Sequence, residues 1–575
     1  MAKRALQSAK GAVAFLLVLN DSLKSEGMDQ RDPEKESEVK QADGPTTDTL
    51  TGLPQNDLNN LEEPALSEQK MYIRGFRLVA ITIAIMVSVL LVAIDVNIIA
   101  TAVPRIASTY NSLHDIGWYG AAYSVAVMAL QPTYGTIYTQ FSLKWTLSAA
   151  LVIFGIGSIA CAVAPSSSAL IVSRSIQGMG GAGIMSGGLN IVADLAPQQK
   201  RPMFLALIAS VYALAGAAGP PIGGLFVDSR LTWRFAFWIN LPLVFIACLI
   251  LLIFYKEPGR NRPERNLKEK LKELQILPSL LLSGAIVCLF FALQRGGVSH
   301  PWSSVGVWPF LLAFAAGLAI FTGLQIYEGE KALIPFRVIG QRTVYSCCIY
   351  AATLLVSSST ISYYLPYYFQ ATKGANARQS GVYILPFVIT NTFVTFVTAG
   401  SITRCGFYVP FMYVGAAILT IGCGLLHTLF TDSPASAWIG FQLIASIGFG
   451  LGIQIPFTAV QVKVPLKDRP IANSLLIFSQ SFGSALALSI DQNIFNASLN
   501  RFLMKIPSVD VAHVISQDPA SITTGVPTGQ VIPIREAYGK ALQAVMIVPI
   551  VAAGIAFLGS LATERGNVKV NEHEE

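Results

Sequence analysis

The chain contains few charged residues, and this shortage decides its broad class. Only 13% of its 575 residues are charged, whereas 53% are hydrophobic, and soluble domains carry about 25% charged residues. A soluble globular fold of this length does not need so large a share of apolar residues to fill its core. The sequence therefore predicts an all-α polytopic membrane protein. Histidine and cysteine are also scarce, with five and seven residues, and their spacing indicates neither a metal site nor a disulfide framework.

Further absences narrow the function. The sequence has no G-x4-G-K-[ST] loop, so ATP is not the expected driver. It shows no catalytic cluster, so we expect neither an enzyme nor a cofactor. Residues 1–74 are polar and acidic and are expected to form a disordered cytoplasmic tail. Gly11–Leu19 in this tail is similar to the apolar region of a signal peptide, but it lacks a good cleavage site, and we expect no cleavage.

From Arg77 onward, apolar segments follow one another, each long enough to cross a bilayer at about 20 residues. We predict fourteen spans, with cores at 78–102, 117–138, 145–165, 169–192, 203–226, 235–255, 276–294, 305–327, 344–369, 380–401, 409–430, 437–458, 471–495 and 541–562. With the N-terminus inside, the inner loops hold seventeen Lys and Arg residues and the outer loops ten. This bias predicts that both termini are cytoplasmic, and it explains the basic surplus without nucleic acid.

The sequence repeats itself weakly. Gly180, Pro197, Arg201 and Pro202 recur 268 positions later as Gly448, Pro465, Arg469 and Pro470, and Gly135 recurs 265 positions later as Gly400. Internal repeats are typical of secondary transporters, whose substrate site lies between the halves. The expected parts are the tail 1–74, a six-helix bundle 75–255, a cytoplasmic loop with an inserted helix pair 256–343, a second six-helix bundle 344–562 with an outer loop 496–539, and a cytoplasmic tail 563–575.

Two opposite charges fall inside predicted spans. Asp95 lies about seven residues from the outer end of the first span, and Arg174 about five from that of the fourth, so both lie roughly 8–11 Å deep. An intramembrane charge persists mainly where it has a partner or lines a polar cavity. We therefore predict an Asp95–Arg174 pair that is a candidate for proton coupling, with a permanent structural ion pair as the alternative.

The second half lacks equivalent charges. Gln442 takes the place of Arg174, and Ser357–Thr360 that of Asp95, so proton chemistry is expected in the first half. Asp491 is expected to lie at the membrane boundary. Polar residues inside spans are candidates for substrate contacts or for helix–helix hydrogen bonds: Asn97, Gln131, Gln177, Tyr364, Gln370, Asn391, Gln454, Asn473 and Gln480.

Two further sites are predicted from local sequence. Pro220 and Pro221 lack backbone donors and should bend the fifth span; with Gly219, Gly223 and Gly224 they form a candidate hinge, or an inert kink. Asn496 begins an Asn-Ala-Ser glycosylation sequon on the expected outer side, although its closeness to the membrane disfavours modification.

Four motifs follow one another along the spans: Ile94–Pro104 reads I-D-V-N-I-I-A-T-A-V-P, Arg174–Gly178 reads R-S-I-Q-G, Gly219–Gly224 reads G-P-P-I-G-G, and Trp233–Pro242 reads W-R-F-A-F-W-I-N-L-P. In this order they resemble the major facilitator superfamily, and within it the fourteen-span drug:proton antiporters of the fungal multidrug and toxin-efflux branch, which includes aflatoxin-pump-like proteins. The corresponding family motifs are L-D-x-T-I-V-N-V-A-L-P, R-x-x-Q-G, the antiporter motif G-P-x-x-G-G, and W-R-W-x-F-x-I-N-x-P. Tyr364–Gln370 resembles the block between helices 9 and 10 of the fungal branch. The loop 135–145 departs from the family pattern, because its aspartate and two basic positions are absent.

The resemblance implies a major facilitator fold with two six-helix bundles and two inserted helices. It also implies a monomeric antiporter that exchanges protons for hydrophobic drugs, toxins or a secondary metabolite. The plasma membrane is the expected location, with the vacuolar membrane as the alternative. Rival functions are a siderophore or basic amino-acid transporter of the same fold and, further off, a non-transporting membrane sensor. A basic substrate would need more cavity acids than Asp95.

Overall fold

The computed structural model describes residues 75–110, 112, 116–228, 232–257, 274–296, 301–375, 377–506, 511 and 528–569. The expected N-terminal tail, with its apolar run 11–19, and most of the basic loop after residue 257 lie outside these residues. Contacts divide the chain into two units, Met1–Ile83 and Ala84–Glu575. The described part of the first unit is the start of helix α3, where Thr82 Oγ1 donates to the Leu78 carbonyl at 2.8 Å. All contacts below lie within the second unit.

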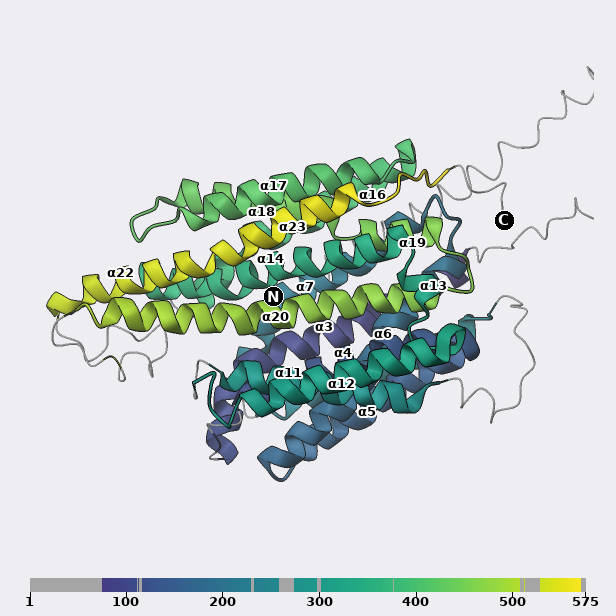
Figure 1. The fold of residues 1–575 in the computed structure, drawn as a ribbon, viewed down its shortest axis with the longest axis horizontal. Coiled ribbons are helices and arrows are strands. Elements are labelled where there is room, and N and C mark those ends of the chain that lie inside the picture. Colours follow the sequence, from purple (N-terminus) through teal and green to yellow (C-terminus); the bar gives the residue numbers. More distant parts are fainter. Residues whose placement is uncertain are drawn as a thin grey trace, which may run out of the picture. The chain divides into compact units, whose positions relative to one another are not determined.

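The described residues are almost entirely helical (Figure 1). The first half of the chain forms α3 (Phe76–Tyr110), α4 (Ile116–Gln140), α5 (Leu143–Val163), α6 (Ser167–Leu195), α7 (Arg201–Asp228), α8 (Phe235–Trp238) and α9 (Asn240–Phe254). Helix α6 packs against α4 and α5, and α5 also packs against α9. Glycines make this packing close: a Cβ on Gly157 of α5 would lie 2.5 Å from the Gln177 backbone of α6.

Two helices and a short connection link the halves: α11 (Ile276–Arg295), α12 (Trp308–Glu328), η3 (Gly329–Lys331) and α13 (Phe336–Ile339). Figure 1 shows α11 beside α12, and α11 also contacts α4. The second half forms α14 (Arg342–Lys373), α15 (Ala377–Tyr383), α16 (Leu385–Cys405), α17 (Val409–His427), α18 (Ala435–Gly452), α19 (Ile455–Lys463), α20 (Arg469–Leu503), α22 (Thr528–Val545) and α23 (Ile547–Leu561). Helix α14 packs against α20 and α23.

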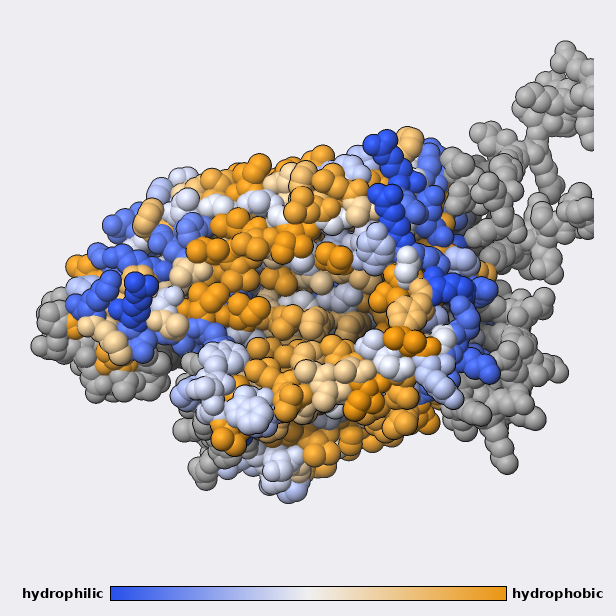
Figure 2. Space-filling model, in the orientation of Figure 1, coloured by the Kyte–Doolittle hydropathy of each residue, from blue (hydrophilic) through white to orange (hydrophobic). Residues whose placement is uncertain are grey.

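The helices confirm a polytopic membrane protein but not the number of spans. Among the described residues, eleven helices are long and apolar enough to cross a membrane. The other three predicted spans coincide with α4, α6 and α7. Helices α4 and α6 are rich in glycine and polar residues, which lowers their hydropathy. Hydrophobic residues cover the middle of the face in Figure 2, and hydrophilic residues gather at both ends of the helices.

The tertiary structure confirms the internal repeat. Arg201 Nε donates to the Ala196 carbonyl at 3.3 Å, and its counterpart Arg469 donates to the Val464 carbonyl at 2.9 Å, five residues back in both cases. Contacts between the halves follow the same symmetry, because α4 meets α20 and α7 meets α16. Gly135 lies in the first of these contacts, where a Cβ would be 3.1 Å from the Ile471 Cα atom.

Helices extend further into the expected outer loop 496–539 than the sequence predicts. Helix α20 continues to Leu503 and α22 begins at Thr528. The two helices pack against each other, as Figure 1 shows. Phe495 of α20 packs against Tyr538 of α22, and Leu499, Leu503 and Ile534 are buried. The sequence missed this because the search followed hydropathy, whereas the extensions carry polar residues on their outer faces.

Candidate functional site

Asp95 is the centre of a buried polar cluster. It lies on α3 with 3% of its surface exposed. Its Oδ2 atom accepts a hydrogen bond from Arg174 Nη1 at 2.5 Å, which is also an ion pair. Its Oδ1 atom accepts from Gln177 Nε2 at 2.8 Å and from Asn240 Nδ2 at 3.1 Å. Helices α3, α6 and α9 thus meet at one carboxylate, and the equal depth predicted for Asp95 and Arg174 brings them into direct contact.

Arg174 is fully buried, with 0% of its surface exposed. Besides Asp95, it donates from Nε to the Tyr119 carbonyl at 3.1 Å and from Nη1 to Gln177 Oε1 at 2.6 Å. Its guanidinium carbon lies 4.6 Å from the centroid of the Tyr123 ring, within the range of cation–π attraction. Removing two charges from water costs several kcal/mol per ion, and only a well-bonded pair offsets this cost.

Local sequence explains why these side chains converge. Gln177 follows Arg174 by three positions, so both point from the same face of α6. Ser158 of α5 joins the cluster, because its hydroxyl accepts from Gln177 Nε2 at 2.8 Å and from Asn240 Nδ2 at 3.2 Å. The predicted candidates included Gln177 but missed Asn240 and Ser158. Asn240 could have been found, because it is an amide inside the apolar run 235–255 at the depth of Asp95.

Two polar atoms of the cluster form no hydrogen bond within the protein. Arg174 Nη2 and Asn240 Oδ1 are buried and have no protein partner. Buried polar atoms are usually satisfied, so each exception calls for an explanation. The cluster therefore contains one unused buried donor and one unused buried acceptor.

The Trp-Arg block anchors the neighbouring end of α5. Arg234 donates from Nη1 to the Ala162 carbonyl at 2.5 Å and from Nη2 to the Ala164 carbonyl at 3.0 Å. These are orphan carbonyls of a helix C-terminus, where a cation is favourable. Tyr110 donates to the same Ala164 carbonyl at 2.8 Å. Burial raises the pKa of Tyr110, and the neighbouring Arg234 opposes that shift.

The candidate hinge residues lie in one continuous helix. Helix α7 runs through Pro220, Pro221 and Gly224 to Asp228, and Gly223 is buried. A Cβ on Gly219 would overlap the Asn97 side chain of α3, so the glycine motif allows these helices to touch. Asn97 itself donates to the Ala93 carbonyl one turn earlier, at 2.7 Å. The bend and the hinge role stay predictions.

Two of the predicted substrate candidates, Gln131 and Asn473, form hydrogen bonds at the contact between the halves of the chain. Ser186 of α6 donates to Gln131 Oε1 at 2.7 Å and lies 3.1 Å from the Ser474 hydroxyl of α20. Asn473 Nδ2 donates to Asn190 Oδ1 at 3.1 Å. Since α6 belongs to one half and α20 to the other, the Ser186–Ser474 and Asn190–Asn473 contacts join the two halves.

The other candidates lie apart from the Asp95 cluster. Gln370 donates to Ser380 at 3.0 Å, Tyr364 is buried against Phe495, and Gln480 is half-buried on α20. Asn391 Oδ1 accepts from Thr395 at 3.4 Å on the same helix. Asn496 accepts from Gln492 at 3.0 Å inside α20, whereas glycosylation acceptors are typical of surface loops.

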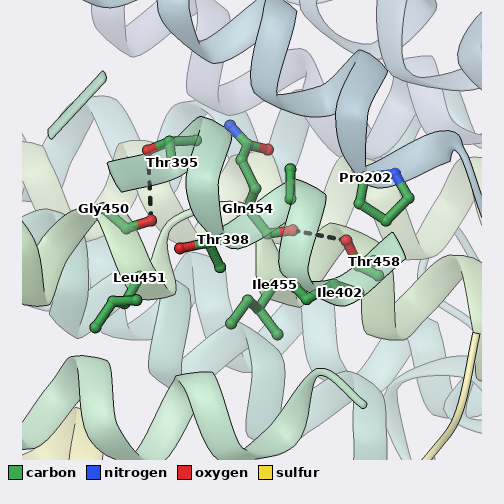
Figure 3. A pocket seen from close by; sticks show the side chains of 10 residues that line it. Pro202, Thr395, Thr398, Ile402, Gly450, Leu451, Gln454, Ile455 and Thr458 are labelled. Atoms are coloured by element: carbon green, nitrogen blue, oxygen red, sulfur yellow. Dashed lines mark hydrogen bonds between the residues drawn. The ribbon is translucent and has the colours of Figure 1, made fainter. Parts of the chain in front are cut away.

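Gln454 lines a small cleft between α7, α16, α18 and α19 (Figure 3). Three threonines share this cleft: Thr395, Thr398 and Thr458. Its cavity volume is about 10 Å³, whereas pockets that bind drug-sized ligands measure about 300–1,000 Å³. The cleft is mildly polar, but it is too small for a large organic substrate in this conformation.

A comparison with family models decides the class of protein. The model described as Major Facilitator Superfamily matches residues 85–488. The chain belongs to this superfamily. It is therefore a multi-pass membrane transporter rather than an enzyme.

Curated relatives of this transporter are fungal efflux proteins. The efflux pump roqT of Penicillium rubens is 37% identical over 518 residues, which cover 90% of this chain and 96% of the relative. The aspyridones efflux protein of Neocamarosporium betae is 37% identical, with 86% and 88% covered. The efflux pump MFS1 of Arthroderma benhamiae is 35% identical, with 91% and 97% covered.

Solved structures agree on the fold of this transporter. The proton:xylose symporter XylE matches with a TM-score of 0.54 at 16% identity, over 83% of this chain and 94% of the symporter. The E. coli fucose:proton symporter FucP matches with a TM-score of 0.54 at 11% identity, over 84% and 98%. These identities support the fold alone.

A glycine at the contact between the halves gives a testable expectation for this transporter. We expect Gly135→Leu to hold α4 and α20 apart, because even a Cβ would lie 3.0 Å from the Ser474 Cβ atom. Transport should stop, and a cysteine placed at Asn190 should react faster with a water-soluble maleimide. Gly120→Leu on the same helix is the control, because Gly120 faces open space. Unchanged maleimide reactivity in Gly135→Leu would show that this contact does not close the pathway.

Proposed function

We propose that this transporter is a proton-coupled efflux antiporter that exports hydrophobic organic compounds, such as drugs, toxins or a secondary metabolite, by alternating access. Its relatives named as efflux pumps support the direction of transport and the class of substrate. The observation that carries proton coupling is the buried cluster of Asp95, Arg174, Gln177 and Asn240. The driving force is a proton gradient, with no bound cofactor.

The cluster supports a coupling step that exchanges partners. With Asp95 ionised, its carboxylate holds Arg174 and the helices α3 and α6 together. A proton on Asp95 removes the charge that compensates Arg174, and an unpaired buried cation is costly. Arg174 then moves toward other acceptors, and the helices rearrange. Because Arg174 already occupies the carboxylate, Asp95 is a poor recognition group for a basic amino acid, which weighs against that rival function.

We further propose fourteen spans, both termini in the cytoplasm, and a monomer in the plasma membrane. Residues expected on one and the same side of the membrane contact one another, which supports the predicted alternation of the spans: Arg337 pairs with Asp468 at 2.5 Å, Arg342 donates to the Ala562 carbonyl at 2.7 Å, and Lys569 donates to the Arg404 carbonyl at 2.5 Å. The excess of Lys and Arg in these loops supports the cytoplasmic side. The two six-helix bundles, 75–255 and 344–562, would then be joined by the inserted pair within 256–343.

An efflux assay tests the proposal. A yeast strain without its own efflux pumps would express the transporter, and extrusion of rhodamine 6G and of neutral Nile red would be followed with and without a protonophore. We expect extrusion of the exported dye to stop with the protonophore and to fall to background in Asp95→Asn, because a neutral amide cannot exchange a proton. Glu536→Gln is the matched control, since Glu536 is exposed on α22. Protonophore-insensitive extrusion would reject proton coupling, and wild-type extrusion by Asp95→Asn would reject the switch.

A further inference from the structure

Asp491 is a buried acidic residue that does not belong to the Asp95 cluster. The sequence places it at the membrane boundary, but the structure encloses it between α20 and α14 with 0% of its surface exposed. Its Oδ2 atom accepts from the Thr360 hydroxyl at 2.6 Å. Its Oδ1 atom is buried without a partner. Within the described residues, no Lys, Arg or His forms an ion pair with it, in contrast to Asp95.

The surroundings of Asp491 are apolar except for hydroxyl groups. Tyr364 of α14 is 1% exposed, interacts electrostatically with the carboxyl, and has a hydroxyl without a partner. Phe495, one turn further along α20, packs against Tyr364 and against Tyr538 of α22. The titratable groups that face Asp491 from these helices are thus tyrosines, which are neutral at physiological pH. An ionised carboxylate here would be a buried charge without a counter-ion, which proteins avoid by neutralising the group.

We propose that Asp491, with Thr360 and Tyr364, forms a second proton-binding site in the C-terminal half of the transporter. A proton on Oδ1 neutralises the carboxyl and gives it a donor, while Thr360 continues to bond Oδ2. With 0% of its surface exposed and no cation paired with it among the described residues, the carboxyl suits a proton better than a hydrated organic cation. This inference rests on the proposed function, because it adds a second carboxyl to the same proton-driven cycle.

The internal repeat gives the site an independent argument. The offset of 265 positions pairs Asp95 with Thr360, and the offset of 268 pairs Gly223 with Asp491. In the first half, Gly219 of α7 touches Asn97 of α3; in the second half, Gly483 of α20 touches Ala352 of α14. The pair α3 and α7 in the first half therefore corresponds to the pair α14 and α20 in the second half. The carboxyl of Asp95 lies on α3, whereas that of Asp491 lies on α20, the counterpart of α7. The second half has not lost its acid, as the sequence suggests, but carries it on α20.

Chemical labelling tests the site without any knowledge of the substrate. Dicyclohexylcarbodiimide is apolar and adds to a protonated carboxyl in apolar surroundings, where it forms a stable N-acylurea that peptide mass spectrometry can locate. In the purified full-length transporter, we expect Asp491 to be labelled at neutral pH and labelling to fall at alkaline pH. Asp491→Asn should lose the label at this position. Absence of labelling at every pH in the wild-type protein would overturn the proposal.

Two variants of α14 distinguish the effect of the Thr360–Asp491 hydrogen bond from a general effect of mutating this helix. Thr360→Val keeps the side-chain volume but removes the bond that favours the ionised carboxyl. We expect labelling of Asp491 to persist to a pH higher by about one unit, as the loss of one hydrogen bond to a charged group implies. Ser359→Ala is the control, because Ser359 bonds to Ser484 instead, and its labelling profile should match the wild type. Identical profiles for all three proteins would contradict the assigned geometry.

A transport assay in proteoliposomes then tests whether the proton on Asp491 is coupled to substrate transport. With the dye that the wild type exports, Asp491→Asn should lose severalfold in uptake driven by a pH gradient but keep dye counterflow, which needs no net proton movement. Equal loss of both activities would assign Asp491 to substrate recognition and reject its role in coupling. Proton-independent transport by the wild type would reject the proposed function, whereas the labelling result would still decide whether the proton site exists.

Discussion

Arg174→Ala is expected to destabilise the transporter by about 3–5 kcal/mol, the usual cost of leaving one member of a buried ion pair without its partner. Asp95 would keep its bonds from Gln177 and Asn240 but would lose the only cation paired with it in the described structure. The variant should also transport nothing. Thermal unfolding of the purified protein, followed by fluorescence-detected size-exclusion chromatography, measures the loss.

The double variant Asp95→Asn with Arg174→Met gives the sharper test of this pair. It removes both charges and keeps the volume, so most of the lost stability should return while transport stays absent. Glu330→Ala is the matched control: Glu330 is 72% exposed and pairs with Arg337 at 2.9 Å, and exposed pairs contribute about 0–1 kcal/mol. Additive losses in the double variant would mean that the two residues act independently.

Gly448→Leu is expected to prevent folding. Gly448 of α18 faces α17 so closely that a Cβ would overlap the Leu419 backbone, and its repeat counterpart Gly180 of α6 faces the Phe154 backbone of α5 in the same way. Overpacking by side chains costs about 1–3 kcal/mol, and a clash with helical backbone costs more because the whole helix must move. Gly180→Leu should therefore behave like Gly448→Leu.

The yield of monodisperse protein measures this effect. Gly440→Leu is the control, because Gly440 lies on the same helix α18 and faces open space. We expect it to be produced like the wild type, whereas Gly448→Leu should aggregate or be degraded. Comparable yields of the two variants would show that α17 and α18 do not need their close contact.

The sequence alone predicted the membrane class, the fourteen helical segments and the repeat. Few charges and long apolar runs exclude a soluble core. Each predicted span coincides with one helix or with two consecutive helices, and eleven of them meet the criteria for a span among the described residues. The Asp95–Arg174 contact was also predictable. Because the bilayer fixes depth by residue count at about 1.5 Å per residue, two buried charges at one depth have few other partners.

Only the tertiary structure decided which side chains surround these charges. Helix α6 carries glycines and apolar residues on all sides, so no periodic pattern shows which face meets which neighbour. Its rotation, set by close contacts such as Gly157 on Gln177, places Gln177 between Asp95 and Ser158. The same holds for Asp491: counting residues places it near a membrane boundary, but the packing of α20 on α14 encloses it beside Thr360. The depth of a residue in the membrane can be counted from the sequence. Which residues of adjacent helices it contacts depends on where small residues allow the helices to approach closely.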